Sequence, residues 1–193
     1  MQVTPGTGER DLLRRLRDGD ERAFEIVYER YQGRVFRFAM QMTGQEAMAE
    51  EITHDVFLEL IREPLRYDET RGPLLPFLLG WARNLVARAL ERDWRYVRES
   101  EEESDQSLLP EPAVWRDLDA ELVTRERIEE LRKVIATLPL PFREAVALCD
   151  LQELDYETAA GVLGCPVGTV RSRLHRGRNL IAARMRSRQG CSI

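Results

Sequence analysis

The stretch from Asp155 to Arg178 constrains the fold most, because it carries signals for two helices and for the turn between them. Asp155 is a good N-cap for a helix over 156–163, and Gly164 is a good C-terminal stop. Pro166 suits the first turn of a second helix, where its missing N–H has no partner to lose. Two helices joined by so short a turn form a helix-turn-helix.

The second helix of this motif has an apolar and a polar side. Its apolar stripe recurs at helical spacing over Val170, Leu174, Gly177 and Ile181. Side chains outside that stripe are candidates for reading base edges and phosphates in a major groove: Thr169, Arg171, Ser172, His175, Arg176 and Arg178. Arg173 lies nearer the packed stripe and is expected to meet a phosphate or an internal acid. The alternative is a solvated, arginine-rich helix, but the agreement of turn, caps and stripe favours a recognition helix.

Charge is unevenly distributed along the chain, whose formal net charge is -5. Residues 97–126 hold ten acids and three arginines, whereas residues 165–193 hold seven arginines and no acid. This asymmetry indicates a basic nucleic-acid reader attached to an acidic segment. We interpret residues 97–124 as a flexible acidic linker, with a reach of roughly 30 Å as a coil and up to roughly 100 Å when extended.

Two further classes of protein are disfavoured by composition. The sequence has no apolar run of membrane-spanning length and no signal-peptide pattern, so we expect a cytoplasmic protein without membrane insertion. Cys149, Cys165 and Cys191 are widely spaced and accompanied by only two histidines. They predict buried or incidental thiols, with a redox-sensing role for Cys191 left open, and neither a metal site nor a cofactor.

The N-terminal half predicts four helices. A short one begins at Glu9 and ends at Gly19, and Asp20 caps a long one whose aromatic residues face a core. The third covers about 45–62, and the fourth covers 74 to about 98 after a loop over 63–73.

The third of these helices carries an acidic face. Glu51 and Asp55 lie one turn apart, with Glu50 and His54 beside them. Paired carboxylates can serve acid–base chemistry or a metal, but no second acidic or histidine cluster accompanies them. A solvated face or a protein-docking face is therefore favoured over a catalytic site.

The loop over 63–73 and the fourth helix carry residues suited to an unstacked base. The loop contributes Arg66, Tyr67, Asp68 and Arg71, and one stripe of the helix contributes Phe77, Asn84 and Arg88. Stacking, base-edge hydrogen bonds and phosphate neutralisation are what a single strand requires. A helix that packs through Trp81 and exposes an ordinary polar face to solvent would show the same pattern. Single-strand binding and a solvated face therefore both remain open.

Helices over 122–137 and 142–150 lead into the helix-turn-helix. The fold class is therefore all-α, with two small helical domains: a four-helix domain over 9–96 and a helix-turn-helix domain over 125–188, joined by the linker 97–124.

Several motifs occur in an order that resembles one family. In the N-terminal half these are Asp20-Glu21-Arg22-Ala23-Phe24, Glu50-Glu51-Ile52-Thr53-His54-Asp55-Val56-Phe57, Arg66-Tyr67-Asp68 and Trp81-Ala82-Arg83-Asn84-Leu85. In the C-terminal half they are Leu138-Pro139, Phe142-Arg143-Glu144-Ala145-Val146, Leu154-Asp155-Tyr156-Glu157 and the run from Cys165 to Leu174. The sequence resembles the extracytoplasmic-function (ECF) sigma factors, small two-domain subunits of bacterial RNA polymerase, with regions 2 and 4 in that order.

This resemblance implies roles for the candidate residues. Glu50, Glu51 and Asp55 would dock on the clamp coiled coil of the largest polymerase subunit, and region 4 on the flap of the second-largest. The loop 66–71 with Phe77, Asn84 and Arg88 would capture single-stranded bases of the -10 element. The second helix of the helix-turn-helix would read duplex DNA at -35. The linker would thread toward the polymerase active centre, and an anti-sigma factor is left open as a further partner.

Two other functions compete with this one. A stand-alone helix-turn-helix regulator would not need the acidic pair or the stripe over 77, 84 and 88. An enzyme using Glu50, Glu51, His54 and Asp55 lacks a second ligand-bearing helix. Two residues depart from the family pattern. Glu153 stands where glycine is frequent, so we expect a different turn there. Phe77 stands where tryptophan is usual, so the sequence preference at -10 is not predicted.

Overall fold

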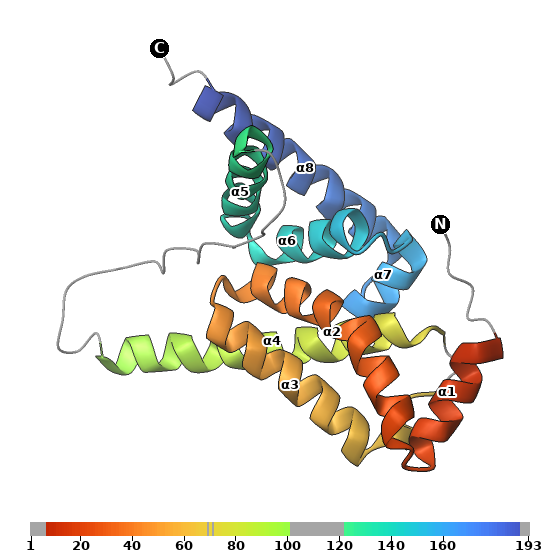
Figure 1. The fold of residues 1–193 in the computed structure, drawn as a ribbon. Helices are drawn as coiled ribbons and strands as arrows, with labels where there is room; N and C mark the ends of the chain where they lie inside the picture. Colours follow the sequence, from red (N-terminus) through yellow and green to blue (C-terminus); the bar gives the residue numbers. More distant parts are fainter. Residues whose placement is uncertain (1–6, 69, 71, 101–121, 190–193) are drawn as a thin grey trace.

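The computed structural model describes residues 7–68, 70, 72–100 and 122–189. The predicted all-α class is confirmed, since the described residues form helices and no strand. Most of the predicted linker, together with Arg71 and Cys191, lies outside the described residues. The helices gather into two groups that lie one against the other (Figure 1).

Among the described residues, the N-terminal group contains α1 (Thr7–Arg17), α2 (Glu21–Thr43), α3 (Glu46–Arg62), the 3-10 turn η1 (Pro64–Arg66) and α4 (Leu74–Ser100). As predicted, Asp20 caps α2, and its carboxylate accepts from the backbone N–H groups of Arg22 and Ala23 at 2.9 and 3.2 Å. The Arg15 guanidinium and these N–H groups lower the pKa of the Asp20 carboxyl. Gly44, at φ 70°, ends the helix in the left-handed conformation.

A core of large side chains holds this group together. The largest fully buried members of the N-terminal half are Phe38, Phe57, Met42, Leu60, Leu74, Leu78 and Leu79. One polar contact lies among them, where the Tyr31 hydroxyl donates to Glu9 Oε1 at 2.6 Å. Burial and this acidic neighbour raise the pKa of Tyr31 to about 12.

The C-terminal group contains α5 (Leu122–Ala136), α6 (Leu140–Val146), the π-helical turn η3 (Ala147–Leu151), α7 (Tyr156–Leu163) and α8 (Val167–Gln189). The prediction that a helix begins at 142 is wrong by two residues, because Pro141 fits the first turn of α6. Asp155 caps α7 by accepting from Thr158 N–H at 2.8 Å, and Gly164 ends it at φ 63°. The predicted helix-turn-helix is confirmed.

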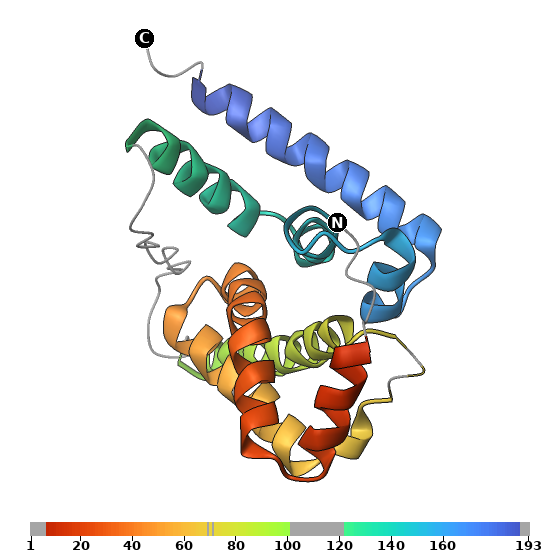
Figure 2. The same ribbon diagram turned by 45° about the vertical axis from the view of Figure 1, so that its right-hand side comes forward.

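The two groups are in direct contact, which the sequence did not suggest. Both views show α6 and α7 between the N-terminal group and α8, which runs along the outside (Figures 1 and 2). Apolar residues of η3 and α7 join the core of the N-terminal group: Ala147, Leu148, Ala159, Ala160 and Leu163. A second, smaller cluster holds α5, α6 and α8 together through Ile135, Leu138, Ala145, Val146 and Leu174.

Candidate nucleic-acid and protein interfaces

The acidic face of α3 is open to solvent. Glu50, Glu51 and His54 are exposed and Asp55 is half-buried, while Ile52 and Val56 on the opposite side are buried. Within the described part of the chain, no three His, Cys, Asp or Glu side chains lie close enough to share a metal ion. The face presents carboxylates outward on a helix that packs against α2 and α4.

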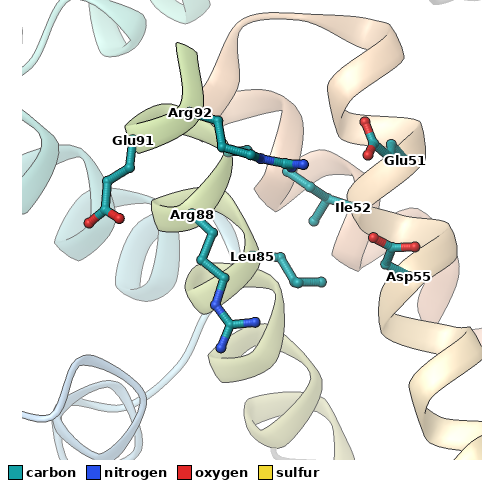
Figure 3. A pocket seen from close by; sticks show the side chains of 8 residues that line it. Glu51, Ile52, Asp55, Leu85, Arg88, Glu91 and Arg92 are labelled. Atoms are coloured by element: carbon teal, nitrogen blue, oxygen red, sulfur yellow. The ribbon is translucent and has the colours of Figure 1, made fainter. Parts of the chain in front are cut away.

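A hollow of about 390 Å³ separates this face from α4. Glu51 and Asp55 line it from α3, and Arg88 and Arg92 line it from α4, with Ile52 and Leu85 between them (Figure 3). Arg92 was missed in the sequence, although it lies one turn beyond Arg88 and shares its side of the helix. The hollow is thus polar at its rims and apolar at its floor.

The loop before α4 uses its aromatic residue internally. Tyr67 is 5% exposed, and its hydroxyl donates to the carbonyl oxygen of Gly72 at 2.7 Å. Asp68 is exposed, and its Oδ1 accepts from the backbone N–H and the hydroxyl of Thr70 at 2.9 and 2.6 Å. As placed, Tyr67 cannot offer a ring face to a base, and Asp68 shapes the loop.

Arg66 and the start of α4 form an aromatic and cationic cluster. The Arg66 guanidinium lies 5.0 Å from the centroid of the Trp81 ring and 3.5 Å from Glu63. Phe77 is half-buried between Tyr67 and Trp81, at ring distances of 5.2 and 5.4 Å. Neither Trp81 as a platform nor its contact with Arg66 was expected from the helical pattern.

The remaining members of the predicted α4 stripe are accessible. Asn84 and Arg88 are both exposed. The stripe is therefore divided, with a half-buried aromatic near the start of α4 and exposed polar groups about two and three turns further on. Arg71, the last member of the predicted set, is not among the described residues.

The inner side of α8 is packed as predicted. Val170 and Leu174 are 0% and 2% exposed, and Ile181 is half-buried. Gly177 is needed at the closest approach, since a Cβ there would lie 2.8 Å from Val146 Cγ2 and 3.3 Å from the carbonyl oxygen of Phe142. The stripe thus anchors α8 rigidly to α6.

The outer side of α8 carries exposed polar groups, namely Arg171, Ser172, His175 and Arg176, while Thr169 is half-buried. The Arg171 guanidinium lies 5.5 Å from the centroid of the Tyr156 ring, a contact absent from the sequence prediction. The Ser172 hydroxyl donates to the carbonyl oxygen of Thr169 at 3.0 Å.

Two other arginines of α8 are engaged inside the domain. Arg178 pairs with Asp150 at 2.5 Å, and this hydrogen bond raises the pKa of its guanidinium. Contact between Arg178 and DNA would require that pair to open. Arg173 is half-buried and lies 3.9 Å from the sulfur of Cys165, in agreement with its expected place near the packed stripe.

Burial affects the chemistry of the two described cysteines. Cys149 and Cys165 are half-buried free thiols, and burial raises the pKa of Cys149 to about 11, which favours the unreactive protonated form. No described helix combines the length and the apolar character needed to cross a membrane.

Comparison with known proteins identifies the two helical groups. Residues 27–96 match the family model of sigma-70 region 2, and residues 128–181 match that of sigma-70 region 4. The ECF RNA polymerase sigma factor SigC of Mycobacterium tuberculosis is 34% identical over 86% of this chain and 84% of its own length. SigE of Mycolicibacterium smegmatis is 32% identical over 83% of this chain, which spans only 62% of that relative.

Solved structures share the fold. The sigma factor RpoE of Bartonella quintana, in complex with the anti-sigma factor NepR, aligns with a TM-score of 0.67 at 23% identity, over 84% of this chain and 96% of its own. CnrH, in complex with the cytosolic domain of CnrY, aligns with a TM-score of 0.65 at 20% identity, over 92% and 97%.

Proposed function

The chain belongs to the ECF sigma factors, and from this premise we propose that it docks on core RNA polymerase through α3, binds the single-stranded -10 element along α4 and reads duplex DNA at -35 with α8. The single observation that carries the proposal is that an exposed acidic face and an exposed basic reading face occur in one chain, on separate helical groups. We assign it no catalysis and no cofactor of its own. Its place of action is the cytoplasm, where the polymerase works.

Docking rests on Glu50, Glu51 and Asp55. Carboxylates one turn apart on a rigid helix suit a partner that offers arginine or lysine at matching spacing, such as the clamp coiled coil of the largest subunit. The hollow beside them could accept a partner side chain, because Ile52 and Leu85 supply an apolar floor. Region 4 on the flap of the second-largest subunit and an anti-sigma factor as regulator are further parts of the proposal.

Charge reversal tests the docking face. Glu51→Arg with Asp55→Arg should weaken core polymerase binding by at least tenfold, measured by fluorescence anisotropy of the labelled chain. Glu25→Arg with Glu29→Arg is the matched control, because this pair is also exposed and one turn apart but lies on α2. Equal affinity of the two double variants would show that α3 is not the docking helix.

At the -10 element, Asn84 and Arg88 are the proposed contacts with base edge and phosphate. Arg66 over Trp81 is the proposed platform, and Tyr67 and Asp68 support the loop from within. Asn84→Ala should reduce binding of the non-template single strand to the polymerase complex, with core binding unchanged. If single-strand binding and core binding fell together, the assignment of Asn84 as a DNA contact would be wrong.

At the -35 element, Arg171, Ser172, His175 and Arg176 are the proposed readers. If Arg176 binds a base edge in a bidentate manner, Arg176→Ala should cost about 1–3 kcal/mol on the preferred duplex and little on a scrambled one. Equal weakening on both duplexes would instead make Arg176 a phosphate contact.

A further inference from the structure

We propose that Asn179 of α8 reads an adenine of the -35 element, and that His175, one turn earlier on the same helix, holds the Asn179 amide ready for this contact. This inference rests on the proposed function, because it takes α8 as the helix that reads duplex DNA. Asn179 is then a further base-reading residue, and His175 acts on the DNA partly through it, as a positioning residue.

Asn179 lies on the reading face of α8. At about 100° per residue, it falls within about 20° of Ser172 and about 40° of His175 around the helix. All three side chains are exposed, whereas Val170 and Leu174 on the packed side are buried. Helix α8 runs along the outside of the molecule, which leaves this face open to a DNA groove (Figure 1).

The Asn179 amide is held by His175. Asn179 Nδ2 donates to His175 Nε2 at 3.0 Å, across one helical turn. Because Nε2 accepts this hydrogen bond, the ring proton of the neutral imidazole is on Nδ1. An exposed amide without a partner rotates among several orientations, and that freedom is lost when it binds a base. The contact with His175 restricts the rotation before DNA arrives, which lowers the entropic cost of binding.

The amide keeps a donor and an acceptor for a base. Its nitrogen carries two N–H groups, of which one is directed at His175 and the other is left. Among the described residues, Asn179 Oδ1 accepts no hydrogen bond. In the major groove adenine presents the complementary pair, an acceptor at N7 beside a donor at N6. Asparagine can match both groups at once, so adenine is the base expected at this position.

The place of this adenine follows from the spacing of the reading residues. Arg178, next to Asn179 in the chain, is engaged with Asp150, but Arg176 is exposed. Arg176 and Asn179 are three residues apart, which is about 4.5 Å along the helix axis. Base pairs are stacked about 3.4 Å apart along the duplex. The adenine should therefore lie within about two base pairs of the base that Arg176 contacts.

Selection from a duplex library tests the assignment. Holoenzyme assembled from the full chain and core polymerase is given promoters that it has already selected, randomised again at -35, and the bound sequences are counted. The unaltered chain should prefer adenine about tenfold over other bases at one position near the Arg176 contact. Asn179→Ala should reduce this preference to about twofold or less and leave the preferences at other positions in place.

Ser187→Ala is the matched control for this selection. It also removes an exposed hydrogen-bonding group from α8, about two turns beyond Asn179, and should leave every base preference unchanged. An unchanged adenine preference in Asn179→Ala would overturn the inference. Equal loss of affinity for all sequences would overturn it too, because Asn179 would then be a phosphate contact. Failure of the unaltered holoenzyme to select any -35 sequence would instead contradict the proposed function.

Variants of His175 separate positioning from packing. His175→Ala removes the acceptor for the Asn179 amide and should lower the adenine preference several-fold. His175→Gln keeps an acceptor at the same spacing along the helix and should restore the preference. Helical content by circular dichroism should be the same in both variants. Equal adenine preference in the alanine and glutamine variants would contradict the positioning role.

A modified base tests the contact at the level of single atoms. In 7-deazaadenine a C–H group replaces N7, so the acceptor for Asn179 Nδ2 is lost while pairing with thymine is kept. Holoenzyme with the unaltered chain should bind the modified duplex several-fold more weakly than the adenine duplex. Holoenzyme with Asn179→Ala should bind both duplexes equally, because the partner of N7 is already absent. A penalty of the same size with both chains would overturn the contact between Asn179 and adenine.

Discussion

The N-terminal and C-terminal groups bury their cores in different ways. The N-terminal group encloses large side chains such as Phe38, Phe57 and Leu60 between its own helices. The C-terminal group divides its apolar residues between a small cluster under α8 and the seam shared with its neighbour. The N-terminal group therefore has a core of its own, whereas the C-terminal group buries part of its apolar surface against the N-terminal group.

This difference matches the proposed division of work. The docking group must present α3 and α4 in one fixed geometry, which a large core provides. The C-terminal group presents α8 as the reading helix, and its seam with the N-terminal core combines Ala147, Ala159 and Ala160 with the larger Leu148 and Leu163. The following substitutions test the difference, from the largest expected effect to the smallest.

Removing a large side chain from the self-sufficient core should be most damaging. Phe38 is 0% exposed, and Phe38→Ala should lower the free energy of unfolding by about 3–5 kcal/mol in urea denaturation followed by circular dichroism. Both groups should lose stability, because the seam continues from this core. Leu65→Ala is the control, since Leu65 is 81% exposed and its loss should change stability by less than about 0.5 kcal/mol.

Overpacking under α8 should have a smaller and local effect. Gly177→Ala places a Cβ against Val146 and should cost about 1–3 kcal/mol, with hydrogen exchange accelerated in the C-terminal group alone. Gly168→Ala on the same helix meets no atom within 4 Å and should be neutral or stabilising. Equal behaviour of the two alanine variants would contradict the close approach.

Asp155→Ala removes the N-cap of α7 and should lower the free energy of unfolding by about 1 kcal/mol in urea denaturation. The backbone N–H and hydroxyl of Thr158 lower the pKa of the Asp155 carboxyl below its usual 3.8. The contribution is therefore complete above the unfolded pKa and disappears as the pH falls through the lowered folded value. Asp155→Asn keeps a capping oxygen but cannot ionise, so it should lose only the acid-dependent part of the stabilisation, whereas Asp155→Ala should lose the cap as well.

Relief of backbone strain at Glu153 should have the smallest effect on the free energy of unfolding, and this effect should be stabilising. Glu153 has φ 56°, a left-handed conformation that costs a non-glycine residue about 1–2 kcal/mol. Glu153→Gly should raise the free energy of unfolding by about 0.5–1 kcal/mol, after the larger chain entropy of glycine is subtracted. Glu153→Ala retains the strain, and a similar gain from alanine would show that charge is responsible.

The helices could be predicted from the sequence because their signals are local. Asp20, Asp155 and Gly164 mark helix ends by their own chemistry, and the stripe of α8 follows from periodicity. Glu153 stands where the family often has glycine, and its φ of 56° is the left-handed conformation that glycine favours, so the different turn expected at this corner stays a prediction. The start of α6 was misplaced because a pair of prolines two residues apart permits either boundary.

The polar contacts between the two groups and the packing of the loop could not be predicted in the same way. Arg34, Arg83, Glu144 and Gln152 are polar residues that look like ordinary surface positions until two distant segments meet. Tyr67 lies in a loop, where no periodicity says whether a ring faces inward or outward. Which candidate residues are accessible therefore depended on tertiary packing.

The most direct test of the central claim is run-off transcription with purified core polymerase on a promoter library. The chain should support initiation only with core present, from promoters that share both a -35 and a -10 sequence, and Glu51→Arg with Asp55→Arg should abolish it without changing duplex binding by α8. Absence of core-dependent initiation from every promoter would contradict the assignment.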